Sequence, residues 1–144
     1  MVEVYGNLWE YPADWRVIST NGTVKKNGEC VMGRGCAAEA KKKYPGLAMD
    51  LGTRIEFYGN VPLIFEQEKL VTFPVKHKWY EKADPKLIEK STAALTRFAL
   101  LHSDEVIALP RPGCGNGQLK WEDVKPLLVG LPDNVKVITF PPTL

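Results

Sequence analysis

Hydrophobic residues along this chain follow two patterns, alternation with polar residues and a recurring spacing of three to four positions. Alternation and short apolar runs, bounded by Gly, Pro and Asn, predict strands over residues 2–5, 16–19, 70–74, 106–109 and 135–139. Two further apolar runs, 54–58 and 62–65, flank Gly59-Asn60. This arrangement predicts a β-hairpin with a tight turn.

The helical spacing is longest after Pro85. The apolar positions that follow share one face of a helix and are Leu87, Ile88, Ala94, Leu95, Phe98 and Leu101. Asp84 is predicted to cap this helix, and Pro85 suits the first helical position. Shorter helices are predicted over 37–44, ended by Pro45-Gly46, and over 121–128.

This order of strands and helices predicts an α/β protein with a mixed or mostly parallel sheet between helices. Ligands of such sheets bind where loops leave the carboxyl ends of the strands. Two glycine-rich loops are predicted there, Val31-Met-Gly-Arg-Gly-Cys-Ala37 and Pro110-Arg-Pro-Gly-Cys-Gly-Asn-Gly117. Glycines let backbone N–H groups approach a phosphate closely, and a helix follows each loop. The sequence therefore predicts an anion site in which two loops hold two ends of one ligand.

Composition narrows this picture to one domain over residues 1–144, because 144 residues with 44% hydrophobic content can bury one sizeable core. The net charge of +2 predicts no broad basic surface, which argues against sequence-independent nucleic-acid binding and leaves a nucleic acid open as a substrate. Three cysteines, Cys30, Cys36 and Cys114, lack CxxC spacing, which argues against a disulfide framework and a zinc site. No membrane-length apolar run or secretory leader pattern is visible, and the cytoplasm is the expected location.

Three segments together resemble the macro domain family, whose members bind ADP-ribose. They are the loop from Val31, Phe73-Pro-Val-Lys-His-Lys-Trp79, and Pro110-Arg-Pro-Gly-Cys-Gly-Asn-Gly-Gln-Leu-Lys-Trp121. In order and spacing they are most similar to the branch of the terminal ADP-ribose glycohydrolases and the DNA ADP-ribosyl-glycohydrolase antitoxins. The resemblance runs nearly end to end. It implies a single macro domain, a three-layer α/β/α sandwich with a central mixed sheet.

The same resemblance implies roles for residues. The first loop would wrap the distal ribose, Asn21 would hold its hydroxyls, the second loop would cradle the diphosphate, and Phe140 would stack on adenine. The residues that it implies for ADP-ribose binding are Asn7, Leu8, Asn21, Val31, Met32, Gly33, Arg34, Gly35, Cys36, Pro112, Gly113, Cys114, Gly115, Asn116, Gly117 and Phe140.

Lys76 and Asn21 are the implied catalytic residues, because Lys76 stands in the Phe-Pro-x-Lys pattern of the glycohydrolase branch. An unprotonated Lys76 amine would attack the opened ribose, whereas a protonated one would orient charge during glycosidic cleavage. Both roles stay open at this point. The simpler alternative is that Lys76 and His77 belong to a solvated connection after a strand.

Two positions depart from the family pattern. Asn7 stands where the family often has an aspartate that accepts a hydrogen bond from the adenine amino group, and the loss of charge assistance costs about 1 kcal/mol. Gly117 stands where protein-directed members carry an acidic partner for the catalytic lysine. A lysine–carboxylate pair of that form is therefore not expected.

Several hypotheses follow. The first is a monomeric enzyme without cofactor or metal, which hydrolyses an ADP-ribosyl derivative of a protein or nucleic acid. The others are a non-catalytic reader or sponge of ADP-ribose or an NAD-derived nucleotide, and a phosphatase of ADP-ribose 1″-phosphate. A dinucleotide oxidoreductase is least favoured, because neither loop has the full GxGxxG spacing. Trp79 is the tryptophan best placed to stack on a base, while Cys36 and Cys114 are expected to pack.

Overall fold

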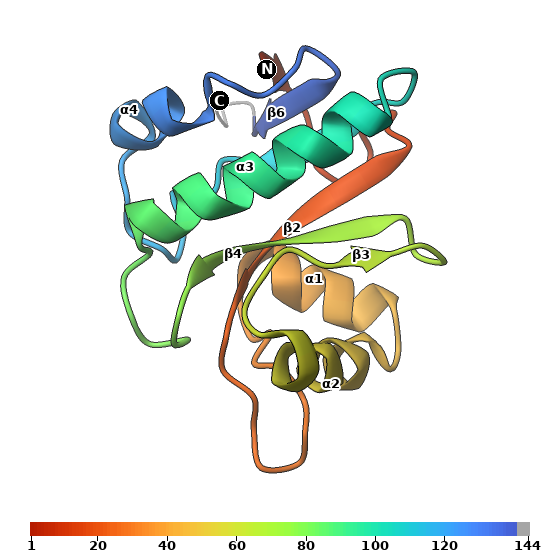
Figure 1. Cartoon of the computed structure of the whole chain (residues 1–144), viewed down its shortest axis with the longest axis vertical. Coiled ribbons are helices and arrows are strands. Elements are labelled where there is room, and N and C mark those ends of the chain that lie inside the picture. Colours follow the sequence, from red (N-terminus) through yellow and green to blue (C-terminus); the bar gives the residue numbers. More distant parts are fainter. Residues whose placement is uncertain (141–144) are drawn as a thin grey trace.

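Six strands form one sheet in the computed structural model, which describes residues 1–140 (Figure 1). Their order across the sheet is β1-β6-β5-β2-β4-β3. Their bounds are β1 (Val2–Tyr5), β2 (Trp15–Asn21), β3 (Ile64–Phe65), β4 (Leu70–Lys76), β5 (Ile107–Pro110) and β6 (Val135–Thr139). Neighbours run parallel except β3, which pairs antiparallel with β4. The sheet is therefore mixed, as predicted.

Helices cover both faces of the sheet (Figure 1). One face carries α1 (Gly35–Lys43) and α2 (Leu47–Tyr58), and the other carries α3 (Pro85–Leu101), α4 (Trp121–Val124) and the 3₁₀ turn η1 (Lys125–Leu128). Strand β2 shows why two cores form. Val17 packs in the core under α3 while its neighbour Ile18 packs in the core under α1 and α2. The predicted three-layer α/β/α sandwich is confirmed.

The predicted hairpin around Gly59-Asn60 is wrong. Residues 54–58 form the end of helix α2, and β3 pairs with β4 instead, with Ile64 opposite Val71. The helix buries Leu47, Ala48, Leu51, Gly52 and Ile55. Arg54 donates to Asp50 one turn earlier at 2.9 Å. The alternation of Ile55 and Phe57 resembled a strand because Phe57 is an exposed apolar residue on the outer face of this helix.

Helix α3 follows its sequence signals. The Asp84 side chain accepts a hydrogen bond from the backbone N–H of Lys86 at 3.0 Å, so it caps the helix whose first residue is Pro85. The predicted helix over 121–128 is divided into α4 and η1, and Pro126 stands at the start of the 3₁₀ turn. No helix among residues 1–140 has the length and apolar character needed to cross a membrane.

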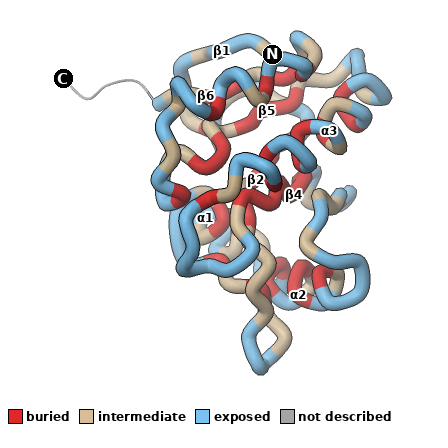
Figure 2. Tube along the Cα trace, turned by 60° about the vertical axis from the view of Figure 1, so that its left-hand side comes forward, coloured by how far each residue is buried: buried red, intermediate tan, exposed pale blue. Residues whose placement is uncertain are grey.

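The parallel strands bring their carboxyl ends to one edge of the sheet. Asn21 at the end of β2 is in register with Lys76 at the end of β4. Pro110 at the end of β5 is in register with Ile138 near the end of β6. The tube in Figure 2 shows the buried strands running out into partly exposed loops. This edge therefore collects residues that are far apart in the sequence.

Candidate functional site

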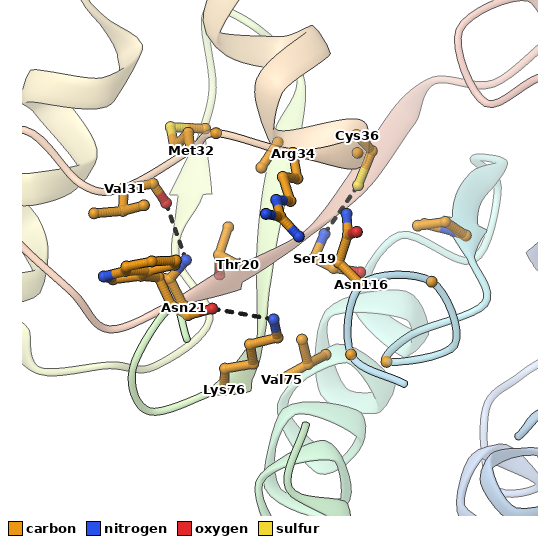
Figure 3. Close-up of a pocket in the computed structure, with 18 of the residues that line it drawn as sticks. Ser19, Thr20, Asn21, Val31, Met32, Arg34, Cys36, Val75, Lys76 and Asn116 are labelled. Atoms are coloured by element: carbon orange, nitrogen blue, oxygen red, sulfur yellow. Dashed lines mark hydrogen bonds between the residues drawn. The ribbon is translucent and has the colours of Figure 1, made fainter. Parts of the chain in front are cut away.

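A pocket of about 890 Å³ opens at this edge of the sheet (Figure 3). Its volume lies in the range of small-molecule sites, about 300–1,000 Å³. The structure brings most of the predicted site residues together in its walls. Those that line it are Leu8, Asn21, Val31, Met32, Gly33, Arg34, Gly35, Cys36, Lys76, Gly113, Gly115, Asn116, Gly117 and Phe140.

Asn21 ties the end of β2 to the first loop. Its side-chain amide donates to the carbonyl of Val31 at 3.0 Å, and its amide oxygen accepts from the N–H of Thr23 at 2.9 Å. These two bonds fix both ends of the amide. Since an amide nitrogen carries two N–H donors, one donor of Asn21 remains for a ligand.

The first loop leads directly into helix α1. Arg34 is the N-cap residue and makes no side-chain cap, so the first turn of the helix leaves backbone N–H groups without helical partners. Gly35, with φ of 61°, Cys36 and Ala37 belong to this first turn, and all three line the pocket. The start of a helix favours an anion through these N–H groups and its dipole.

Cys36 fastens the first turn of α1 to strand β2. Its sulfur accepts a hydrogen bond from the backbone N–H of Ser19 at 3.4 Å (Figure 3). Burial raises the pKa of the Cys36 thiol, as it does for Cys114, and it raises the pKa of Cys30 to about 11. These cysteines are therefore thiols at neutral pH. No group of three His, Cys, Asp or Glu that would hold a metal ion occurs within residues 1–140.

The second loop is held by packing and by its own backbone. Gly113 has a φ of 76°, and its carbonyl accepts from the N–H of Leu119 at 2.9 Å. A Cβ on Gly117 would lie 2.5 Å from the carbonyl oxygen of Gly113, so no side chain fits there. A Cβ on Gly115, in contrast, would meet nothing within 4 Å. The tight fold of this loop therefore requires glycine at position 117 and leaves no room for an acidic side chain there.

The two loops approach each other across the pocket. A Cβ on Gly35 would lie 3.4 Å from the side-chain nitrogen of Asn116, so little room separates α1 from the second loop. In Figure 3, Asn116 lies beside Cys36 and Arg34. This close approach narrows the middle of the pocket.

Lys76 is fixed at the end of β4. Its amine donates to the carbonyl of Trp79 at 3.2 Å, and its own carbonyl accepts from the side chain of Asn60 at 2.9 Å. Burial, and then the positive charge of Arg34, lower the pKa of the Lys76 amine. Figure 3 shows Arg34 reaching into the pocket from the first loop, above Lys76 on β4. The unprotonated amine is thus more accessible here than on an ordinary surface lysine.

Cations outnumber carboxylates in the walls. Lys25, Arg34, Lys76 and Arg111 line the pocket against Glu39 and Glu81. Arg111 lies 3.7 Å from the carboxylate of Glu3 and stacks on Trp121. The remaining three cations take part in none of the ion pairs within residues 1–140. The pocket therefore favours an anionic ligand.

Three predicted residues do not line the pocket. The side-chain oxygen of Asn7 accepts from the N–H of Trp9 at 2.8 Å and shapes the turn after β1. Pro112 is buried. The Cys114 thiol donates to the Pro112 carbonyl at 3.6 Å and packs against the core under α3. His77 also lies outside the pocket, where its ring pairs with Asp84 at 2.8 Å.

Sequence reasoning missed part of the wall. Trp79 was singled out and does line the pocket, but the other lining residues were not, namely Ser19, Thr20, Lys25, Ala37, Glu39, Val75, Tyr80, Glu81, Pro110, Arg111, Gln118 and Ile138. Most of these residues stand within two positions of a predicted site residue. Their closeness to the ends of the predicted strands could therefore have identified them. Lys25 and Tyr80 lie in loops whose course no local pattern predicts.

Comparisons with known proteins agree with this geometry. No family model matches the sequence. A DNA ADP-ribosyl glycohydrolase of Thermus aquaticus is 31% identical over 132 residues, which cover 85% of this chain and 35% of that protein. The chain thus spans about a third of the length of this curated relative.

Two solved structures share the fold. The macrodomain of Mycobacterium tuberculosis DarG has a TM-score of 0.75 and 28% identity, with 99% of each chain covered. Thermosipho africanus DarTG in complex with ADP-ribose has a TM-score of 0.78 and 22% identity, and the match covers 97% of this chain and 42% of that one. The first is alike from end to end, and the second is alike over less than half of its length.

Proposed function

The chain belongs to the macro domain family, and from that premise we propose that it binds ADP-ribose in the pocket and hydrolyses the bond between ADP-ribose and an acceptor. The single observation that carries this proposal is the placement of Lys76 in register with Asn21, at one end of a pocket rich in free N–H groups and cations. The acceptor belongs to a protein or a nucleic acid. We further propose a monomer in the cytoplasm, where three free thiols are stable.

The diphosphate would lie between the two glycine loops. Backbone N–H groups of residues 113–117 and of the first turn of α1 would donate to its oxygens, and the helix start would add a partial positive charge. Gly115 leaves open space for this approach. Such dipoles stabilise the charge without a metal ion.

The two ends of the ligand would then fall on different walls. Phe140, which is 68% exposed, would stack on adenine, with Leu8 and Ile138 beside it in the same pocket. The distal ribose would lie at Asn21, whose remaining amide N–H would donate to a hydroxyl. This orientation brings the anomeric carbon to Lys76.

Lys76 would act on that carbon as an unprotonated amine. Its nitrogen lone pair would attack the anomeric carbon and form a carbon–nitrogen bond. The bond from that carbon to the acceptor would break, and the acceptor would take its electron pair together with the proton that the amine nitrogen loses. Water would then hydrolyse the carbon–nitrogen bond and free the amine. The lowered pKa of Lys76 supports this role over that of a fixed positive charge.

Calorimetric titration tests the binding half of the proposal. ADP-ribose is expected to bind with micromolar affinity and more tightly than NAD or AMP. Gly115→Glu is expected to weaken the binding of ADP-ribose at least about tenfold, because its carboxylate would occupy the diphosphate position. Absence of binding by all three nucleotides would refute the proposal. Release of ADP-ribose from modified protein and DNA then tests the catalytic half.

A reader that binds ADP-ribose without turnover is the second candidate. Gly117 favours it, because the packing around this glycine leaves no room for a carboxylate partner of Lys76. Tight ADP-ribose binding with no release from any conjugate would support the reader and contradict the enzyme.

A further inference from the structure

Arg111 stands between the two parts of the pocket that would hold adenine and the diphosphate. Pro110 is in register with Ile138 and lines the adenine wall with it, and Gly113 begins the diphosphate loop. Arg111 lies between Pro110 and Gly113 along the chain and lines the same pocket. The ribose that joins adenine to the diphosphate would therefore pass beside Arg111.

The guanidinium of Arg111 is oriented by an aromatic ring. It lies over the ring of Trp121, the first residue of α4, at 4.7 Å from the ring centroid. The ring is itself fixed, because the indole N–H of Trp121 donates to the carboxylate of Glu3 at 2.9 Å. A guanidinium that stacks by its face keeps its edge, which carries the N–H donors, for pairing in its own plane. Arg111 thus presents an oriented set of donors.

These donors are not used up by the protein. Within residues 1–140, the Nε of Arg111 has no hydrogen-bond partner, and its Nη2 lies 3.7 Å from the Glu3 carboxylate, beyond hydrogen-bond length. Nε is buried, but the side chain as a whole is 33% exposed. A ligand in the pocket would therefore meet the outer nitrogens of the guanidinium.

Glu3 does not cancel the positive charge of Arg111, because it is shared with a second cation. The amine of Lys125 lies 2.6 Å from the other oxygen of Glu3. The hydrogen bond from Lys125 lowers the pKa of the Glu3 carboxyl, so this group is ionised at neutral pH. Two cations against one carboxylate leave one net positive charge, which favours an anion at this wall.

Arg111 is separated from the other cations of the pocket. Lys25 and Arg34 lie between β2 and α1, and Lys76 ends β4. Among the lining residues that the structure describes, Arg111 is the cation on the side of β5 and β6. Backbone N–H groups of residues 113–117 would already hold the diphosphate there, so the guanidinium stays available for a further anion.

We propose that Arg111 forms a subsite for a phosphate carried by the ribose next to adenine, at its 2′ or 3′ hydroxyl. A phosphate monoester offers several oxygens that accept hydrogen bonds from the fork of an arginine. An arginine beside the adenosine ribose is also how dinucleotide sites accommodate the 2′-phosphate of NADP. This inference rests on the proposed function and extends its ligand to a phosphorylated ADP-ribose. The 2′-phosphorylated form is the ADP-ribose part of NADP.

Calorimetric titration of the wild-type protein with three ligands tests the subsite. The ligands are ADP-ribose and its two forms with one added phosphate, at the 2′ or at the 3′ hydroxyl of the adenosine ribose. We expect one phosphorylated form to bind at least about tenfold more tightly than ADP-ribose at low salt, the gain of hydrogen bonds between charged groups. The form that gains identifies the hydroxyl, and added salt should reduce the gain because the guanidinium is partly exposed.

Variants then locate the gain. Arg111→Gln should reduce the preference for the phosphorylated form at least about fivefold, because the charged donors are lost. The preference is a ratio of two affinities measured on one protein, so a smaller folded fraction lowers both affinities alike. Arg97→Gln removes an exposed arginine that does not line the pocket and should keep the wild-type preference.

A second variant is expected to act in the opposite direction. Glu3→Gln removes the negative charge beside Arg111, while its amide oxygen can still accept from the indole N–H of Trp121. The preference for the phosphorylated form should rise at least about twofold, the size expected for a partly exposed ion pair. A purely structural role of Arg111 would produce no such rise.

The outcomes separate the subsite from the proposed function. Binding of ADP-ribose that is as tight as, or tighter than, the binding of both phosphorylated forms would overturn the subsite and leave the proposed function standing. A preference for a phosphorylated form that survives in Arg111→Gln would also overturn it. Failure of ADP-ribose and both phosphorylated forms to bind would overturn the proposed function, and the subsite with it.

Discussion

The two glycine loops enclose one pocket but present different chemistry to it. The half around the first loop offers side chains, since Asn21, Arg34 and Lys76 all reach the cavity there. The half around the second loop offers mainly backbone beside the side chains of Arg111 and Asn116, because Gly113 needs a positive φ and Gly117 has no room for a Cβ. Chemistry and specificity can thus be changed at the first half by substitution, whereas the second half is restricted by its fold.

This difference between the two loops follows from the elements that surround each of them. The first loop lies between β2 and α1. The side chains of β2 alternate between the two cores. The second loop packs on Ala83, Ile88 and Leu119, which lie within van der Waals reach of Gly113. Tight packing leaves N–H groups as the main donors that this loop can present to an anion.

The largest expected effect is on the first half. Lys76→Ala should lower the rate of release of ADP-ribose from its conjugate by at least about a hundredfold, since a positioned nucleophile or base contributes this much. The affinity for ADP-ribose should stay within a few fold, because backbone N–H groups of the two glycine loops, and not Lys76, would hold the diphosphate. Single-turnover assays and calorimetry measure the two quantities, with Lys90→Ala as the matched control. Equal losses of both would contradict a catalytic role.

A negative charge introduced into the second half of the pocket should weaken the binding of ADP-ribose. Gly115→Glu fits sterically, because a Cβ there meets nothing within 4 Å, but it places a carboxylate where the diphosphate would lie. We expect affinity for ADP-ribose to fall at least about tenfold by charge repulsion. Gly130→Glu, at a position equally open and away from the pocket, should bind normally. An unchanged affinity in Gly115→Glu would place the diphosphate elsewhere.

A pair of alanine substitutions compares the packing of the two loops. Gly117→Ala should lower the free energy of unfolding by about 1–3 kcal/mol, because its methyl group would lie 2.5 Å from a backbone oxygen. Gly33→Ala in the first loop should be nearly neutral, since a Cβ there meets nothing within 4 Å. Urea unfolding followed by tryptophan fluorescence measures both. Equal stabilities of the two variants would remove the distinction between the loops.

The smallest expected effect is a shift of the pH profile. If the neutral amine of Lys76 attacks, kcat/KM rises with pH through the lowered pKa of this amine and then levels off. Arg34→Ala removes the positive charge that helps lower this pKa, so the rise should move to higher pH. A profile that falls with pH through the same range would show that the protonated lysine is the active form. Lys42→Ala, at an exposed position of α1, controls for a general loss of charge.

The sequence predicted elements wherever a local signal matched the tertiary contacts. Asp84 and Pro85 start helix α3 as their residue types require, and strand β6 occupies the predicted residues. The end of helix α2 was predicted as a strand, because Ile55 and Phe57 alternate with polar neighbours as strand residues do. In the helix, Ile55 is buried and Phe57 is exposed. Most predicted site residues line the pocket, but Asn7 does not, since its side chain turns back to the N–H of Trp9.

The sequence by itself determined the α/β order of elements, the two glycine loops at strand ends and Lys76 as the residue to test. Only the tertiary structure decided that Lys76 stands in register with Asn21, that Arg34 lowers its pKa, and that Trp79 holds its amine beside an exposed aromatic pair. Local hydrophobic patterns report which side of an element is buried. The register of parallel strands, set by contacts between distant segments, decides which side chains meet at their ends.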